Sequence, residues 1–202
     1  MRKISNDFKR KAKRIQKRII LIAYEGKTEK EYFKNFESND KNFTIIFAHD
    51  NHTDPMGMIS ILKNKMQENN IDPDQGDKIY CIFDTDTDPL KNKIIKEVYD
   101  LAQKYNIQII TSNPCIEFWF YLHYKYTTKY MSSEDAVKHI KKACPSYEKG
   151  KSIYKELEDK ILFAIKNAKK LEKYQKENAK DIKLIEANPS TMIYKIVEEL
   201  IK

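Results

Sequence analysis

The sequence predicts an α/β fold with a parallel four-stranded sheet, flanking helices and a helical C-terminal part. Four short and mainly apolar runs are typical of strands buried on both faces: residues 19–24, 43–48, 79–83 and 107–111. Helical patterns separate these runs, and that alternation favours right-handed crossovers and a single parallel sheet. Beyond residue 124 the pattern is helical and charged, which indicates a second, helical part.

Helix-start signals lie between the predicted strands. Thr28 is followed three residues later by Glu31, a capping-box pattern, so a helix is expected directly after the first strand. Asp54 and Pro55 place a proline at the first position of a helix that runs to about residue 69. A third helix, residues 90–104, precedes the last strand.

The remaining helices follow the fourth strand. Asn113 is interpreted as the cap, and Pro114 as the first residue, of a buried aromatic helix. Later helices are expected at residues 132–142 and 151–174, and at residues 192–201 after the start signal Asn188-Pro189-Ser190-Thr191.

Length and composition indicate one sizeable α/β domain with a smaller appendage. We expect a basic arm at residues 1–18, an α/β domain at 19–124 and a helical part at 125–202. No apolar run approaches the roughly 20 residues of a membrane span, and no apolar segment of a secretory signal follows the basic N-terminus. The three cysteines lack metal-binding spacing, so reduced thiols and a cytoplasmic location are expected.

The net charge of +8 is concentrated at the N-terminus. Residues 1–18 carry nine lysines and arginines against one acid, Asp7, and the remainder is neutral. Such an arm suits nucleic-acid phosphates through counterion release, although charge alone also fits a solubilising tail. The residues expected to contact nucleic acid are Lys9, Arg10, Lys11, Lys13, Arg14, Lys17 and Arg18.

The third apolar run ends abruptly in three aspartates, Asp84, Asp86 and Asp88, before Pro89. Asp84 and Asp86 are two apart, so they point to the same side of an extended chain. Two like charges at the end of a buried strand are best stabilised by a hard cation that takes oxygen ligands, such as Mg²⁺.

Three other kinds of site can contain an acidic stretch of this type. An EF-hand loop is excluded, because it needs glycine and glutamate where Pro89 and Ile95 stand. A solvated acidic turn is the simplest alternative. A nucleophilic aspartate of the haloacid dehalogenase type also follows a hydrophobic strand and is the competing enzyme.

Other polar side chains are predicted at the same edge, because the carboxyl ends of parallel strands meet there. Glu25 follows the first strand, and Glu29 lies in the first turn of the next helix. His49 and His52 follow the second apolar run. Imidazole can bind a metal or act as a general base, although the simpler interpretation is that both side chains contact water in a polar loop. The candidates at the site edge are Lys27, His49, His52, Ser112, Asn113 and Glu117, of which Glu117 needs a partner, a cation or a raised pKa in its aromatic surroundings.

Together these motifs resemble the RloB-like proteins, also called the RloB/AbiL group. The stretch Glu25-Gly26-Lys27-Thr28-Glu29-Lys30-Glu31-Tyr32-Phe33 is similar to the family signature EGxTEKxYF. The Asp84/Asp86 pair, residues 112–123 and the closing Asn188-Pro189-Ser190-Thr191 are also similar to that family. The resemblance covers nearly the whole chain after residue 18.

The resemblance implies a Toprim-like domain, the fold shared by topoisomerases, primases and overcoming-lysogenization-defect nucleases. It implies that Glu25, Asp84 and Asp86 surround Mg²⁺ or Mn²⁺, with Glu29 and Asp88 as further metal-binding acids. The haloacid dehalogenase alternative is disfavoured, because its nucleophile lies on the first strand whereas Glu25 follows an earlier strand than Asp84.

The implied activity is metal-dependent phosphodiester cleavage in DNA or RNA. The family is associated with bacterial phage defence by abortive infection, beside an AAA-type ATPase partner. Two alternatives remain open from the residues. One is a small-molecule phosphohydrolase, and the other is a non-catalytic nucleic-acid-binding or regulatory subunit of an ATPase complex.

Overall fold

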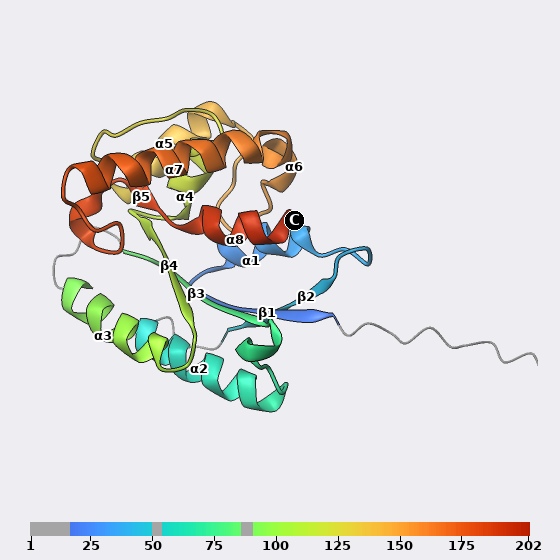
Figure 1. Cartoon of the computed structure of the whole chain (residues 1–202). Coiled ribbons are helices and arrows are strands. Elements are labelled where there is room, and N and C mark those ends of the chain that lie inside the picture. Colours follow the sequence, from blue (N-terminus) through green and yellow to red (C-terminus); the bar gives the residue numbers. More distant parts are fainter. Residues whose placement is uncertain (1–16, 50–53, 86–90) are drawn as a thin grey trace, which may run out of the picture.

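The computed structural model describes residues 17–49, 54–85 and 91–202 (Figure 1). Five strands form one sheet in the order β2-β1-β3-β4-β5. The first four are parallel, and β5 runs antiparallel to β4. Their bounds are β1 Arg18–Tyr24, β2 Phe43–Ala48, β3 Lys78–Asp84, β4 Gln108–Asn113 and β5 Ser190–Thr191. The predicted α/β class is confirmed, and the sheet has a fifth strand that was not predicted.

Helices cover both faces of the sheet (Figure 1). Helices α2 (Pro55–Glu68) and α3 (Lys91–Gln103) lie on one face. The other face carries α1 (Lys27–Phe33), α4 (Ile116–Leu122), α5 (Ser133–Ala143), α6 (Tyr154–Leu157), α7 (Ile161–Glu177) and α8 (Ile193–Leu200). Short 3-10 segments occupy Lys34–Phe36, Pro73–Gln75, Glu158–Lys160 and Ile185–Ala187. None of the helices in this described part is long and apolar enough to cross a membrane.

The strands read as continuous apolar runs because each of their faces packs against helices. In β1, Ile20 and Ile22 belong to the larger core, which includes the C-terminal helices. Leu21 and Ala23 belong to the smaller core beneath α2 and α3. Successive side chains of a strand point to opposite faces, so a doubly covered strand loses its polar alternation. The C-terminal helices therefore share a core with the central strands.

Helix α1 begins without the predicted capping box. Gly26 is its N-cap, and no side chain caps the helix. The Thr28 hydroxyl instead accepts a hydrogen bond from the backbone N–H of Gly150, at 3.1 Å. The capping-box prediction for Thr28 and Glu31 was therefore wrong, because the threonine serves a distant loop.

The interpretation of Asn113 and Pro114 as a helix start was also wrong. Asn113 is the last residue of β4, and α4 begins at Ile116 after the N-cap Cys115. The Asn113 side-chain amide donates to the Ile185 carbonyl at 2.8 Å. The peptide bond between Asn113 and Pro114 is cis, as is the bond between Asn188 and Pro189.

The Asn188 motif places β5 beside β4, just before the predicted last helix. The Asn188 side chain donates to Asn113 Oδ1 at 2.8 Å and to the Met131 carbonyl at 2.9 Å, and accepts from the Met131 N–H at 2.9 Å. The last helix, α8, follows the motif and agrees with its predicted bounds to within one residue at each end. A strand of two polar residues has no apolar run, which is why the sequence did not reveal it.

The other helices lie near their predicted positions. Helices α2 and α3 agree with the prediction to within one or two residues, and Asp54 caps α2 through the Gly57 N–H at 2.8 Å. The single helix expected at residues 151–174 is divided into α6, a 3-10 segment and α7. Ser132 and Asp135 form a capping box at the start of α5.

Candidate functional site

Glu25 and Asp84 meet at the carboxyl edge of the sheet. Strands β1 and β3 are parallel neighbours, with Tyr24 opposite Ile82. The backbone N–H of Asp84 donates to Glu25 Oε2 at 3.1 Å. The next two acids of this stretch, Asp86 and Asp88, lie outside the described residues.

Two more carboxylates join this pair from helices on the same side of the sheet. Glu29 comes from α1 and Glu117 from α4, and their exposed fractions are only 3% and 2%. Together with Glu25 and Asp84 they line a pocket of about 300 Å³. Four carboxylates separated by up to 92 residues in the sequence therefore gather at one place.

The two buried acids of this pocket, Glu29 and Glu117, form no ion pair within the described residues. Burial, together with the neighbouring Glu25 and Glu117, raises the pKa of Glu29 to about 7. An arrangement of buried oxygen donors with excess negative charge fits a divalent cation.

A loop after α5 covers the pocket. The Tyr147 hydroxyl donates to Glu117 Oε1 at 2.6 Å. Gly150, with φ of +78° in the left-handed region that favours glycine, donates its N–H to Thr28 at 3.1 Å. These two bonds hold the loop on either side of Lys149, whose side chain helps to line the pocket.

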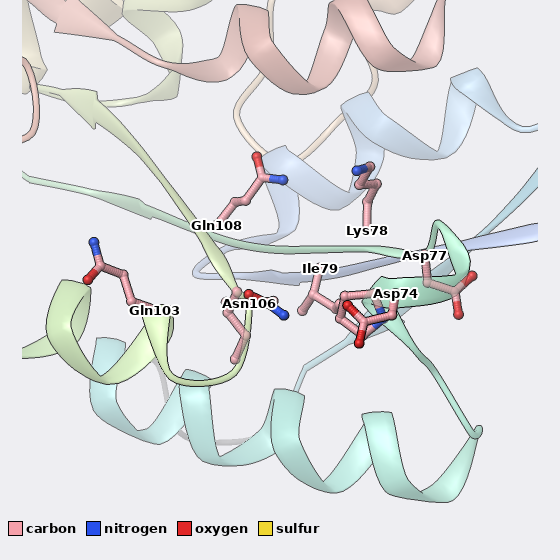
Figure 2. Close-up of a pocket in the computed structure, with 9 residues that line it drawn as sticks. Asp74, Asp77, Lys78, Ile79, Gln103, Asn106 and Gln108 are labelled. Atoms are coloured by element: carbon pink, nitrogen blue, oxygen red, sulfur yellow. The ribbon is translucent and has the colours of Figure 1, made fainter.

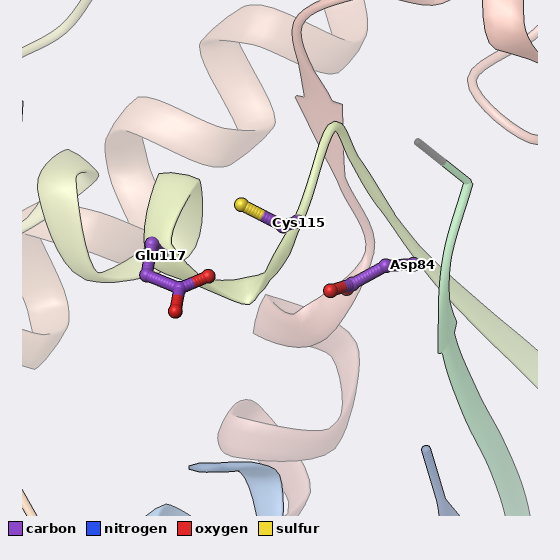
Figure 3. Close-up of side chains that lie close together, drawn as sticks. All are labelled: Asp84, Cys115 and Glu117. Atoms are coloured by element: carbon purple, nitrogen blue, oxygen red, sulfur yellow. The ribbon is translucent and has the colours of Figure 1, made fainter. Parts of the chain in front are cut away.

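A second pocket of about 440 Å³ adjoins the first and shares Glu25, Asp84, Glu117 and Lys149 with it. Its other lining residues are Cys115 and four residues of α5, namely Ser133, Glu134, Val137 and Lys138. Figure 3 shows Asp84, Cys115 and Glu117 coming from β3, from the turn after β4 and from α4. One donor atom of each lies within 4.8 Å of the others. Burial, Glu117 and Asp84 all raise the pKa of the Cys115 thiol.

Sequence reasoning missed Cys115, Tyr147 and Lys149 as site residues. Cys115 stands two residues before Glu117, so its place in the same motif was the available signal. Tyr147 and Lys149 lie in a loop of the C-terminal part, and no local pattern connects that loop to the acids.

The other predicted edge residues lie in different settings. Lys27 is exposed and lines the first pocket. His49 is exposed at the end of β2 and stacks on Tyr24, with ring centroids 4.8 Å apart, and it lines neither pocket. Ser112 is buried, with its hydroxyl 3.0 Å from that of Thr191, so it joins β4 to β5. The second histidine, His52, lies outside the described residues.

Only the last two residues of the predicted basic arm are described. Lys17 is exposed and donates to the Asn39 carbonyl at 2.9 Å. Arg18 is the first residue of β1, forms an ion pair with Glu199 and lies over the Phe43 ring. The predicted contact residues Lys9, Arg10, Lys11, Lys13 and Arg14 lie outside the described part.

A pocket of about 470 Å³ lies at the opposite edge of the sheet, near the amino ends of β3 and β4 (Figure 2). One of its two acidic lining residues, Asp77, forms hydrogen bonds with backbone N–H groups. The carboxylate accepts from the Ile19 N–H at 2.7 Å and from the Asp72 N–H at 2.9 Å. Asp77 therefore holds β1 and the loop before β3 together.

Comparison with known proteins agrees with the motifs. A family model described as RloB-like protein matches residues 20–200. Comparison with curated proteins and with solved structures gave no match. The matched region contains the whole carboxylate site and all but the first residues of the sheet. The chain belongs to the RloB-like protein family.

Proposed function

We propose that this protein is a metal-dependent nuclease of the Toprim type, which cleaves phosphodiester bonds of DNA or RNA with Mg²⁺ or Mn²⁺. One observation carries the proposal. Glu25, Glu29, Asp84 and Glu117 converge on one pocket at the carboxyl edge of a parallel sheet, where ligands of open α/β sheets bind.

Glu25, Asp84 and Asp86 are the residues proposed to hold the metal, with Glu29 and Asp88 as further ligands. When bound, the metal orients the attacking water and neutralises charge on the phosphate. The bond from the Asp84 N–H holds the Glu25 carboxylate beside Asp84 before any metal arrives. Carboxylates held in this way lose little freedom on binding.

The lysines around the acids suit a phosphate substrate. Lys27 and Lys149 line the first pocket, and Lys138 and Lys149 line the second. An ammonium group attracts a phosphate as a point charge. We assign Lys149 to the phosphate next to the bond that is cut, because it is the one cation among the described residues that lines both pockets.

The resemblance to the family supports a proposal about the biological setting. We propose a cytoplasmic nuclease of phage defence, acting in abortive infection beside an AAA-type ATPase encoded with it. The basic N-terminal arm, with most of the net charge, would bind the nucleic-acid backbone outside the pocket.

The test uses the purified full-length protein with Mg²⁺ or Mn²⁺. Plasmid DNA, total RNA and a phosphate monoester are incubated separately, with and without EDTA. We expect metal-dependent cleavage of DNA or RNA that is lost in Asp84→Ala. Asp74→Ala is the matched control, because Asp74 lines the pocket at the opposite edge of the sheet.

The outcomes separate the function classes. Hydrolysis of the monoester alone would reject the nuclease in favour of a small-molecule phosphohydrolase. Cleavage that begins only when the ATPase is added supports a nuclease under partner control. An absence of cleavage with the ATPase present would contradict the proposal and favour a binding or regulatory subunit.

A further inference from the structure

We infer that Asp84, Cys115 and Glu117 form a binding site for a divalent transition metal of the Zn²⁺ class, with Cys115 as a thiolate ligand. The inference deepens the proposed function, since Asp84 belongs to both metal sets. It adds a soft ligand to a site otherwise made of carboxylates.

The geometry of the three side chains is the first argument. One donor atom of each lies within 4.8 Å of the other two. Ligands of a tetrahedral Zn²⁺ site lie about 2.0–2.3 Å from the ion, and so roughly 3.5 Å from one another. The three residues come from separate elements (Figure 3). Rotation of their side chains can bring the donor atoms from within 4.8 Å to the ligand spacing of such a site.

The burial of the group is the second and independent argument. Cys115 is 5% exposed and Glu117 is 2% exposed. Within the described ranges no lysine or arginine forms an ion pair with Glu117. A buried carboxylate requires a compensating partner, and a metal cation supplies one.

The surroundings of the group suit a metal site. The pocket of about 440 Å³ that contains all three side chains gives an ion access from solvent. The Tyr147 hydroxyl, 2.6 Å from Glu117 Oε1, orients the carboxylate from outside the metal shell. This leaves the second oxygen, Oε2, for a bond to the metal.

The chemistry of the ligands decides which metal binds. Mg²⁺ takes oxygen ligands and retains water, whereas thiolates select Zn²⁺ and similar ions. As the metal–sulfur bond forms, the thiol proton leaves to solvent. A Zn²⁺ ion held here occupies Asp84 and therefore competes with the Mg²⁺ or Mn²⁺ of the proposed nuclease.

The test is cobalt spectroscopy of the metal-free protein. Co²⁺ bound to a thiolate gives a sulfur-to-cobalt charge-transfer band in the near ultraviolet. We expect this band in the wild-type protein, its displacement by Zn²⁺, and its loss in Cys115→Ser. The same variant should bind Zn²⁺ at least about tenfold more weakly by calorimetry.

The other two cysteines provide matched controls. Cys81 is a residue of β3 whose side chain lies in the smaller core. Cys144 lies beside Ser146 at the end of α5, with Sγ and Oγ 3.2 Å apart. Cys81→Ser and Cys144→Ser should keep the band. Glu117→Gln retains the thiol and should weaken Co²⁺ binding, which tests the site even where Cys115→Ser fails to fold.

Two results would overturn the inference. They are a stoichiometric Co²⁺ complex of the wild type without the band, and a band that persists in Cys115→Ser. No nucleic acid enters this experiment, so its outcome is separate from the nuclease assay. A band in a protein that cleaves nothing even with the ATPase present upholds the metal site and rejects the nuclease. Cleavage by a protein that shows no band does the reverse.

Discussion

The backbone N–H of Asp84 donates to Glu25 Oε2 at 3.1 Å, across the adjacent ends of β3 and β1. The two residues are 59 positions apart in the sequence. The bond holds the Glu25 carboxylate against the backbone of Asp84, which carries the second carboxylate. This relationship makes the edge between β1 and β3 the centre of the candidate site.

Asp84→Ala should abolish metal-dependent cleavage and the thermal stabilisation that Mn²⁺ gives. The metal-free variant should melt at the wild-type temperature or above, because removing one of several crowded carboxylates relieves repulsion. Thermal denaturation with and without Mn²⁺ measures both effects, with Asp74→Ala as control. An unchanged Mn²⁺-induced shift in Asp84→Ala would remove Asp84 from the metal site.

Glu29 should make the metal-free protein less stable as the pH rises towards neutrality. Burial raises the pKa of Glu29 to about 7 from an ordinary value of 4.5. Between these pH values the folded protein holds a proton that the unfolded chain has released. The stabilisation that protonated Glu29 gives the folded state is therefore complete below about pH 4.5 and is lost as the pH passes 7. The free energy of unfolding falls by about 3 kcal/mol at most.

Chemical denaturation of metal-free wild type and Glu29→Gln at about pH 5 and about pH 8 measures this effect. The variant should show a smaller fall in the free energy of unfolding, because glutamine does not titrate. Saturating Mn²⁺ should also flatten the wild-type profile. Parallel profiles for the two metal-free proteins would show that Glu29 ionises normally.

Lys149→Ala should weaken nucleic-acid binding more than it slows turnover. The lysine lines both pockets, and its loss removes one phosphate contact. The slope of log affinity against log salt should fall by about one. Lys142→Ala, an exposed lysine near the end of α5 that lines neither pocket, is the control. Equal slopes for wild type and Lys149→Ala would place Lys149 outside the substrate path.

Asn188→Ala should destabilise the fold by about 2–4 kcal/mol, because the substitution leaves buried partners of three hydrogen bonds unsatisfied. Urea denaturation measures the loss. Asn178→Ala is the control, since its exposed side chain makes one bond, to the Tyr174 carbonyl at 2.8 Å. A change below about 0.5 kcal/mol in Asn188→Ala would argue against this structural role for the motif.

Deletion of residues 1–16 should weaken nucleic-acid binding and flatten its salt dependence without unfolding the protein. The segment contains seven of the 38 lysines and arginines and lies before β1. The cut leaves Lys17 and Arg18 in place, because both are bonded to the folded part. Binding measured against salt for both forms gives the answer. Equal slopes would identify the segment as a solubilising tail.

The sequence by itself determined the class of the fold and the edge where the acids lie. Strands buried on both faces leave continuous apolar runs, and a residue that follows such a run in a parallel sheet lies at its carboxyl edge. That rule placed Glu25 and Asp84 correctly relative to each other. It needed no long-range information, because right-handed crossovers determine the direction of each strand.

Only the tertiary structure decided which polar side chains serve local structure and which serve distant partners. Thr28 and Asn113 carry ordinary helix-start signals, yet their side chains bond to Gly150 and Ile185. A hydroxyl or amide forms a hydrogen bond with whichever partner folding brings near, and sequence spacing does not reveal which partner that is.

The same reason explains Tyr147, Lys149 and strand β5. Their neighbours lie tens of residues away in the sequence, and their own stretches have no apolar period or motif that predicts those contacts. The larger core brings α4, the loop after α5 and β5 against the sheet. Packing of that core thus adds Tyr147 and Lys149 to the carboxylates that the sequence predicted at this edge.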